Sequence, residues 1–234
     1  RGANDPRSDI FDLLAGAGSE IRMLNEFGVK QARTMAEIMP EVVDNTSKDR
    51  GVRTGFDSID GKLRLEPGTV TIIGARPAMG KTTFALNIAE HAAIKTRKPV
   101  AVFSMEMSAS QLALRLISAN GRVNATRLRT GQLEDEDWSR VSSAIRMIKE
   151  TKIFIDDTPG LSPEALRAKA RRLKREHGLG LIVIDYLQLM AVPGNSENRA
   201  TEISEISRSL KGLAKELNVP VIALSQLNRS LETR

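Results

Sequence analysis

The sequence predicts an α/β protein with a mainly parallel sheet that helices cover on both faces. Three observations favour this class. Short, continuously apolar runs alternate with stretches of helical periodicity from about position 69 onward, as expected for parallel strands that are buried on both faces. The segment 69–84 (TVTIIGARPAMGKTTF) reads as a strand, a glycine-bearing loop and a helix. The composition is 41% hydrophobic and only 3% aromatic, which indicates an aliphatic core.

Five short apolar runs predict the strands of this sheet. Each is rich in Val, Ile and Leu and too short for a typical helix, so a strand is favoured. A Pro67-Gly68 turn leads into the first run, and turn residues of this kind mark strand boundaries. The expected strands cover 70–73, 100–104, 152–156, 181–184 and 220–225.

Start and stop residues place the helices between these strands. Ser108 is expected to cap one helix, and Ser162 followed by Pro163 opens another that ends at Gly178, because Ser at the N-cap, Pro at the first position and Gly after the last are favoured there. The helices are expected at about 81–95, from 108 onward, at 134–149, 163–177 and 202–217, with a short helix or turn at 124–131.

The expected helix at 134–149 has an apolar side at three- and four-residue steps. Trp138, Val141, Ile145 and Ile148 share that side. This one-sided pattern is typical of an amphipathic helix.

Residues 1–50 are expected to form a helical linker or subunit-docking segment, separate from an α/β domain at 51–234. Short amphipathic helices are predicted at about 8–14, 20–27 and 30–43, followed by a polar joint at 44–50. Such helices cannot bury their apolar sides alone. They dock either on their own domain or on a neighbouring copy of the chain, and the sequence leaves both alternatives open.

The composition excludes several classes of protein and site. There is no cysteine, so disulfides and thiolate metal sites are absent and a reducing compartment is the natural inference. The two histidines, His91 and His177, are far apart and make a poor metal set. No apolar run approaches the length of a membrane span, and no signal peptide is evident. The net charge of +6 suits a polyanionic partner but is weak evidence by itself.

The loop after the first expected strand fits the phosphate-binding pattern G-x-x-x-x-G-K-[ST] at every fixed position. Its backbone N–H groups and the following helix N-terminus would face a nucleotide triphosphate. Lys81 is expected to contact the β- and γ-phosphates, and the Thr82 hydroxyl to bind Mg²⁺. The nucleotide-binding residues expected here are Gly74, Ala75, Arg76, Pro77, Ala78, Met79, Gly80, Lys81, Thr82 and Thr83.

Polar residues follow three other expected strands. Parallel strands carry their ligands at the carboxyl ends. Asp185 follows four apolar residues, the shape of a Walker B carboxylate that holds Mg²⁺, although such an Asp can also be a helix cap. Glu106 is a candidate for orienting the attacking water, or a cap for the helix at Ser108. Gln226 is a candidate sensor of the γ-phosphate.

Several arginines are weaker candidates. Arg115 lies nine residues after Glu106. It is a candidate nucleotide contact, and an arginine that faces solvent is the simpler alternative. The helix at 163–177 is strongly basic, which fits a nucleic-acid or subunit contact or, more simply, a solvated face. Arg229 and Arg234 are tentative DNA contacts. No aromatic residue accompanies them, so contacts to a phosphate backbone are favoured over base stacking.

Taken together, these motifs resemble the C-terminal motor domain of the bacterial replicative DNA helicase, the DnaB family. The resemblance covers about Arg53 to the end and rests on blocks in the same order and spacing. These blocks are GARPAMGKTTFALNIA, FSMEMS, LRTGQL, IDDTP, LIVIDYLQLM, ENRATEISEISRSLKGLAKEL and PVIALSQLNRSLE.

The resemblance implies a RecA-like P-loop fold in a homohexameric ring that uses ATP and Mg²⁺ to move 5′→3′ on single-stranded DNA. It implies Glu106 as the catalytic glutamate, Asp185 as the Walker B residue, Gln226 as the coupling glutamine and Arg115 as a nucleotide contact. It also implies primase and a helicase loader as partners and a bacterial cytoplasmic location.

Two departures from the family pattern set expectations for this chain. The N-terminal primase-binding domain is absent, and the sequence stops before the family's main DNA loop and its arginine finger. A finger of this kind contributes about 10³–10⁵ in rate in GTPases, so we expect weak, DNA-insensitive ATPase activity from residues 1–234 alone. Two alternatives stay open: another RecA-type ATPase such as a recombinase, and a non-catalytic module that binds the ring or its loader.

Overall fold

The computed structural model describes residues 32–46, 51–191 and 199–227. Contacts divide the chain into two units, Arg1–Asp49 and Arg50–Arg234, and each is considered by itself. In the first unit, α2 covers Met35–Thr46. It begins there because Thr34 and Glu37 exchange side-chain-to-backbone hydrogen bonds, at 2.8 and 3.4 Å, in a capping box. The helices expected at 8–14 and 20–27 lie outside the described residues.

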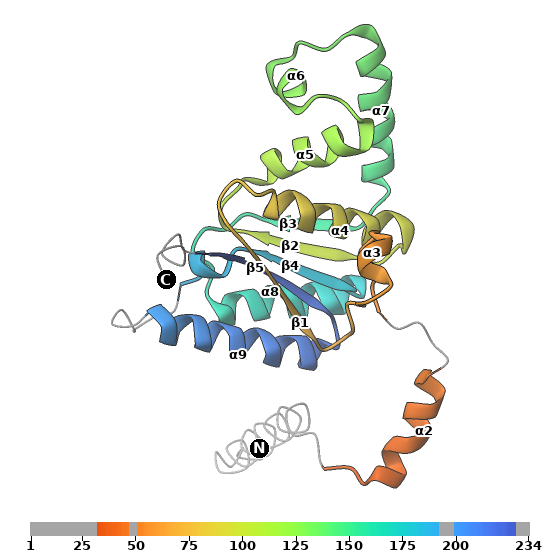
Figure 1. Cartoon of the computed structure of the whole chain (residues 1–234), viewed down its shortest axis with the longest axis vertical. Coiled ribbons are helices and arrows are strands. Elements are labelled where there is room, and N and C mark those ends of the chain that lie inside the picture. Colours follow the sequence, from red (N-terminus) through yellow and green to blue (C-terminus); the bar gives the residue numbers. More distant parts are fainter. Residues whose placement is uncertain (1–31, 47–50, 192–198, 228–234) are drawn as a thin grey trace, which may run out of the picture. The chain divides into compact units, whose positions relative to one another are not determined.

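The second unit is built on one five-stranded, all-parallel sheet (Figure 1). Its order is β1-β5-β4-β2-β3, and every pairing between these five strands is parallel. This arrangement confirms the predicted fold class. The strands are β1 (Val70–Ala75), β2 (Val100–Ser104), β3 (Ile153–Asp156), β4 (Leu181–Asp185) and β5 (Val221–Gln226).

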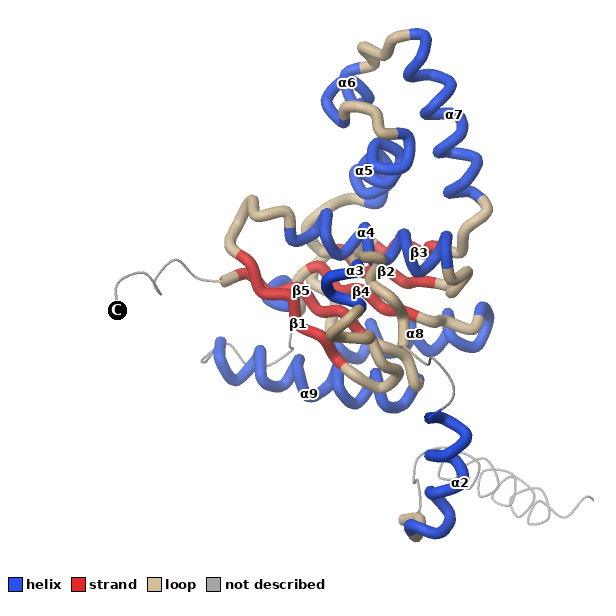
Figure 2. The backbone as a smooth tube through the Cα atoms, turned by 45° about the vertical axis from the view of Figure 1, so that its right-hand side comes forward, coloured by secondary structure: helices blue, strands red, loops and turns tan. Residues whose placement is uncertain are grey.

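Helices cover both faces of this sheet. In Figures 1 and 2, α8 and α9 lie against one face and α4 against the other, while α5, α6 and α7 extend beyond α4. The short α3 precedes β1, and the 3-10 turn η1 follows β4. The bounds are α3 Asp57–Asp60, α4 Lys81–Lys95, α5 Ala109–Gly121, α6 Ala125–Thr130, α7 Asp135–Lys149, α8 Pro163–His177, η1 Leu187–Leu189 and α9 Arg199–Leu217.

The expected helix boundaries are confirmed where capping residues define them. Ser108 caps α5 and forms a capping box with Gln111. Ser162 caps α8 by accepting a hydrogen bond from the N–H of Ala165, and the helix ends at Gly178, whose φ is 70°. A positive φ strongly favours glycine at that position. The Ser108–Gln111 capping box leaves no capping role for Glu106 at this helix.

Alternating strand residues feed two hydrophobic clusters, one on each face of the sheet. On β2, Val100 and Val102 belong to the cluster beneath α4 and α5, whereas Ala101 and Phe103 belong to the cluster beneath α8 and α9. The residues of β4 and β5 alternate in the same way. Successive side chains of a strand point to opposite faces, so a strand that is apolar throughout can supply both clusters.

The apolar side of α7 is not buried at its largest residue. The Trp138 side chain is 54% exposed, and the neighbouring Asp137 is only 4% exposed. The carboxylate of Asp137 accepts hydrogen-bonded or ionic contacts from Arg127 at 3.2 Å and Arg140 at 3.0 Å. This ionic network fixes the α6–α7 turn and faces Asp137 inward, which rotates Trp138 toward solvent.

Among the described residues, no helix is both long and apolar enough to cross a membrane.

Candidate functional site

The loop between β1 and α4 presents an uncapped helix N-terminus. Ala78 and Gly80 have positive φ angles, 63° and 79°, which turn the chain from the strand into the helix. The N-cap residue is Gly80, which has no side chain that could cap the first turn of α4. Backbone N–H groups at such a terminus can bind an anion. The expected phosphate-binding conformation, strand to loop to helix, is therefore present.

The first side chains of α4 meet the end of β4. The Thr82 hydroxyl donates a hydrogen bond of 2.7 Å to Oδ2 of Asp185. Lys81 Nζ lies 3.8 Å from Asp185 Oδ1 and 4.2 Å from the centre of the Tyr186 ring. The β4 residue that was expected to hold a metal ion thus lies beside both phosphate-loop residues.

The environment of Asp185 fits a magnesium ion held partly by substrate. Asp185 is 2% exposed, and its Oδ1 has no hydrogen-bond partner among the described residues. The described residues contain no cluster of three His, Cys, Asp or Glu side chains that could hold a metal alone. Magnesium is commonly bound by one or two protein oxygens together with phosphate oxygens and water, and Thr82 and Asp185 supply such a pair.

A cavity of about 300 Å³ lies at the carboxyl edge of the sheet, and Thr82 lines it whereas Asp185, behind Thr82, does not. The predicted catalytic candidates Glu106 and Gln226 line it, although their strands, β2 and β5, lie on either side of β4. Arg115 also lines it, and its guanidinium donates a 3.2 Å hydrogen bond to the Thr83 hydroxyl. The full lining is Arg76, Pro77, Ala78, Gly80, Lys81, Thr82, Glu106, Met107, Arg115 and Gln226.

Some predicted nucleotide contacts lie outside this lining. Gly74 and Ala75 are the last two residues of β1, and the Met79 side chain is 72% exposed. Arg229 and Arg234 lie outside the described residues, so their assignment as DNA contacts stays a prediction.

Sequence reasoning missed three residues near the site. Met107 lines the cavity, Tyr186 lies under Lys81, and Gln188 contacts the main chain of Gln226. Two of these, Tyr186 and Gln188, directly follow Asp185 in the segment LIVIDYLQLM. A polar or aromatic residue just beyond a strand tip was the signal available, but its partner could be identified only from the strand order.

The basic helix α8 uses much of its charge within the chain. Arg167 and Arg171 both pair with Glu216 of α9, and Lys169 pairs with Asp156 of β3 at 2.6 Å. Arg172 pairs with Glu176 of the same helix. These ion pairs within the chain favour a role of α8 in holding the domain together over a role as a nucleic-acid surface.

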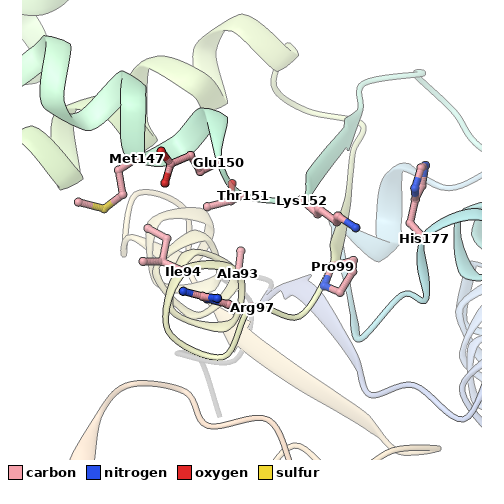
Figure 3. Close-up of a pocket in the computed structure, with 9 residues that line it drawn as sticks. All are labelled: Ala93, Ile94, Arg97, Pro99, Met147, Glu150, Thr151, Lys152 and His177. Atoms are coloured by element: carbon pink, nitrogen blue, oxygen red, sulfur yellow. The ribbon is translucent and has the colours of Figure 1, made fainter.

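A second cavity, of about 660 Å³, lies at the opposite end of the strands (Figure 3). Pro99 and Lys152, which precede β2 and β3, line it together with Arg97 and His177. It lacks the phosphate loop and the carboxylate at the end of β4. The chemistry expected from the sequence is therefore concentrated in the smaller cavity.

The smaller cavity combines three capabilities. An uncapped helix N-terminus and Lys81 can bind phosphate oxygens, Thr82 and Asp185 can hold a divalent cation, and Glu106 can accept a proton from, or orient, a water molecule. Positioning and charge stabilisation of this kind are what phosphoryl transfer requires. The arrangement is therefore suited to binding and hydrolysing a nucleoside triphosphate.

Comparison with known proteins is consistent with this geometry. A family model described as "DnaB-like helicase C terminal domain" matches residues 51–234. A "Replicative DNA helicase DnaB" from Buchnera aphidicola subsp. Schizaphis graminum (strain Sg) is 56% identical over 237 residues, covering 95% of this chain and 51% of the relative. One from Geobacillus stearothermophilus is 54% identical over 186 residues, covering 79% and 41%.

The chain is also similar to solved structures of helicase and ATPase domains. A DnaB-like replicative helicase described with its interactions with primase has a TM-score of 0.77 and 34% identity, with 93% of this chain and 54% of that chain covered. The ATPase domain of G40P has a TM-score of 0.79 and 35% identity, with coverage of 87% and 75%. The chain spans about half the length of the curated relatives it matches.

Proposed function

Because the chain belongs to the DnaB-like helicase C-terminal domain family, we propose that it is the ATP-driven motor of a replicative DNA helicase. One observation carries the proposal: Thr82, which lines a cavity together with Glu106 and Gln226, donates a 2.7 Å hydrogen bond to Asp185. This contact supports a site in which the phosphate loop, the proposed metal-binding carboxylate, the proposed base and the proposed sensor act on one ligand.

ATP binds with its triphosphate against the loop that precedes α4. Lys81 and the backbone N–H groups of that loop hold the phosphates. Thr82 and Asp185 would hold Mg²⁺, which would supply positive charge to the phosphates. Lys81 lies near Asp185 and Tyr186, so the phosphates compete with these two residues for the ammonium group.

Hydrolysis depends on the residues at the neighbouring strand ends. Glu106 orients the attacking water and accepts its proton, because it is an exposed carboxylate at the rim of the same cavity. Gln226 contacts the γ-phosphate through its amide and reports its loss. Arg115, held by Thr83, contacts the nucleotide from the side of α5.

The motor works as a homohexameric ring that moves 5′→3′ on single-stranded DNA in the cytoplasm. Residues 1–50 connect it to a neighbour. This assignment is supported by the sequence of α2, in which Met35, Met39 and Val43 recur at four-residue steps. Such spacing gives the helix one apolar side, which is suited to docking. Primase and a helicase loader are the further partners, and Arg229 and Arg234 are DNA contacts.

Strand displacement is the direct test. The full-length protein is mixed, in the presence of ATP and Mg²⁺, with duplex DNA that carries either a 5′ or a 3′ single-stranded tail. Unwinding that needs the 5′ tail supports the proposal. Strand exchange between homologous duplexes without tail preference indicates a recombinase. Absence of both unwinding and phosphate release on single-stranded DNA indicates a non-catalytic module, and either result overturns the proposal.

A further inference from the structure

A glutamine outside the predicted catalytic set holds the main chain of Gln226. Gln188 lies in η1, directly after β4. Its Nε2 donates to the carbonyl of Gln226 at 3.1 Å and to the Ser225 hydroxyl at 2.9 Å. Its Oε1 accepts from the N–H of Gln226 at 3.3 Å. Both halves of one carboxamide thus bind the backbone of a single residue.

These bonds give β5 a hydrogen-bonded neighbour on its β4 side beyond the point where the β4–β5 pairing ends. The β4–β5 pairing stops at Ile184 and Ala223. The carbonyl of Asp185 instead accepts a hydrogen bond from the N–H of Met105, on the β2 side. On the other side of β5, β1 still pairs as far as Gln226. Without Gln188, the end of β5 would have no hydrogen-bonded neighbour on its β4 side among the described residues.

The position of Gln188 is itself well fixed. Leu187 and Met190, on either side of it, are only 3% and 2% exposed. The turn is closed by backbone hydrogen bonds of 3.0 and 3.1 Å at Leu189 and Met190, and the carbonyl of Gln188 accepts a hydrogen bond from Arg199. The carboxamide therefore acts from a rigid base that continues directly from Asp185.

We infer that Gln188 is a positioning residue that fixes Gln226 relative to Asp185. The inference rests on the proposed function, in which Gln226 responds to the γ-phosphate. Gln188 joins the two strand tips, so the sensor keeps one distance from the metal-binding carboxylate. Loss of the bond would leave ATP binding intact, because Lys81 and Thr82 are unaffected, and would slow the step that requires Gln226 in place.

Amide hydrogen exchange tests the contact without any catalytic readout. Gln188→Met keeps the length of the side chain and removes all three hydrogen bonds. In this variant of the chain we expect the Gln226 amide to exchange at least about tenfold faster, as for other amides released from a hydrogen bond, with Ile222 and Ala223 unchanged. An unchanged Gln226 amide, or an equal increase throughout β5, would overturn the inference.

ATP turnover by the full-length protein on single-stranded DNA tests the consequence. For Gln188→Met we expect kcat to fall about tenfold with the KM for ATP within about twofold, the pattern of an interaction needed after binding. Gln188→Glu, which keeps only the acceptor, lies between this variant and the wild type. Gln132→Met, on an exposed glutamine before α7, is the control and keeps wild-type turnover.

The outcomes separate the two proposals. A Gln188→Met protein with wild-type kcat, or one whose kcat, KM and melting temperature all change together, contradicts the positioning role. If the wild-type protein shows no DNA-dependent turnover, the motor proposal fails, while the exchange experiment still decides whether Gln188 holds the end of β5.

Discussion

Thr82 and Asp185 are 103 positions apart in the sequence and share a hydrogen bond of 2.7 Å. The bond joins the first turn of α4 to the tip of β4, and it uses only one of the two carboxylate oxygens. The other, Oδ1, is buried without a hydrogen-bond partner among the described residues. A buried carboxylate oxygen in this condition is costly, and a bound cation relieves that cost.

Replacing Asp185 with Asn tests the metal assignment. The Asn side chain can still accept the bond from Thr82, so the melting temperature should not fall. Without Mg²⁺, nucleotide affinity should not be weaker than wild type, because the change removes a competitor of the phosphates for Lys81. With Mg²⁺, the Kd of the variant should be at least about tenfold weaker than wild type, or about 1.4 kcal/mol.

Titration of a fluorescent ATP analogue with and without Mg²⁺ measures both effects of Asp185→Asn. Asp135→Asn, on an exposed carboxylate, is the control. Equal Mg²⁺ dependence in Asp185→Asn and wild type would show that Asp185 does not hold the metal ion.

Replacing Lys81 with Met tests phosphate binding. The change keeps most of the apolar side chain and removes the charge that faces the cavity, so the Kd for an ATP analogue should rise by about 10- to 100-fold, or about 1.4–2.8 kcal/mol. Calorimetric titration measures it. Lys149→Met, at an exposed position of α7, should bind like wild type, and wild-type affinity in Lys81→Met would place the phosphates elsewhere.

Replacing Asp137 with Ala tests the ionic network of the α6–α7 turn. The change leaves Arg127 and Arg140 without their shared partner. Since hydrogen bonds to charged groups are worth about 1.5–3 kcal/mol, the free energy of unfolding should fall by about 2 kcal/mol. Urea denaturation measures it, with Glu136→Ala at an exposed neighbour as the control. A loss no larger than that of the control would mean that the network contributes little to stability.

Asp60 should give the stability a specific acid dependence. Burial by itself raises the pKa of Asp60, but hydrogen bonds from Thr54 and Gly55 outweigh it and hold the pKa below its usual value. An acid whose pKa is lowered by folding adds stability above its unfolded pKa of about 3.9, and that stability is lost as the pH falls through the folded pKa.

Asp60→Asn should therefore be less stable than wild type at pH 7, with a difference that shrinks below about pH 4. Denaturant unfolding at pH 7, 5 and 3 measures the difference, with Asp57→Asn in the same short helix as a control. A difference that is the same at pH 3 and pH 7 would exclude the ionised carboxylate as its source.

The strands and the phosphate loop could be predicted because their signals are local. Each strand is a short apolar run between turn residues, and the loop carries Gly80 and Lys81 at fixed spacing. The convergence of Glu106, Asp185 and Gln226 was also predictable, because parallel strands end at one edge of a sheet. Capping residues such as Ser108 placed the helix ends for the same local reason.

The remaining features depend on partners that are distant in sequence. Periodicity puts Trp138 on the apolar side of α7, but the arginines that pair with the buried Asp137 come from α6 and α7 together. Gln188 follows a strand tip, but its partner could not be identified locally, because its role follows from the place of β5 beside β4. The pairing of Arg167 and Arg171 with Glu216 likewise required the contact between α8 and α9.

The account rests on one nucleotide site with Glu106 at its edge, and Glu106→Gln tests it most directly. The change keeps the shape of the side chain and removes the group that accepts a proton. In the full-length protein with single-stranded DNA, the variant should bind an ATP analogue with wild-type Kd and release phosphate at least about 100-fold more slowly, within the range for a general base. Phosphate release at the wild-type rate, or loss of nucleotide binding, would contradict the account.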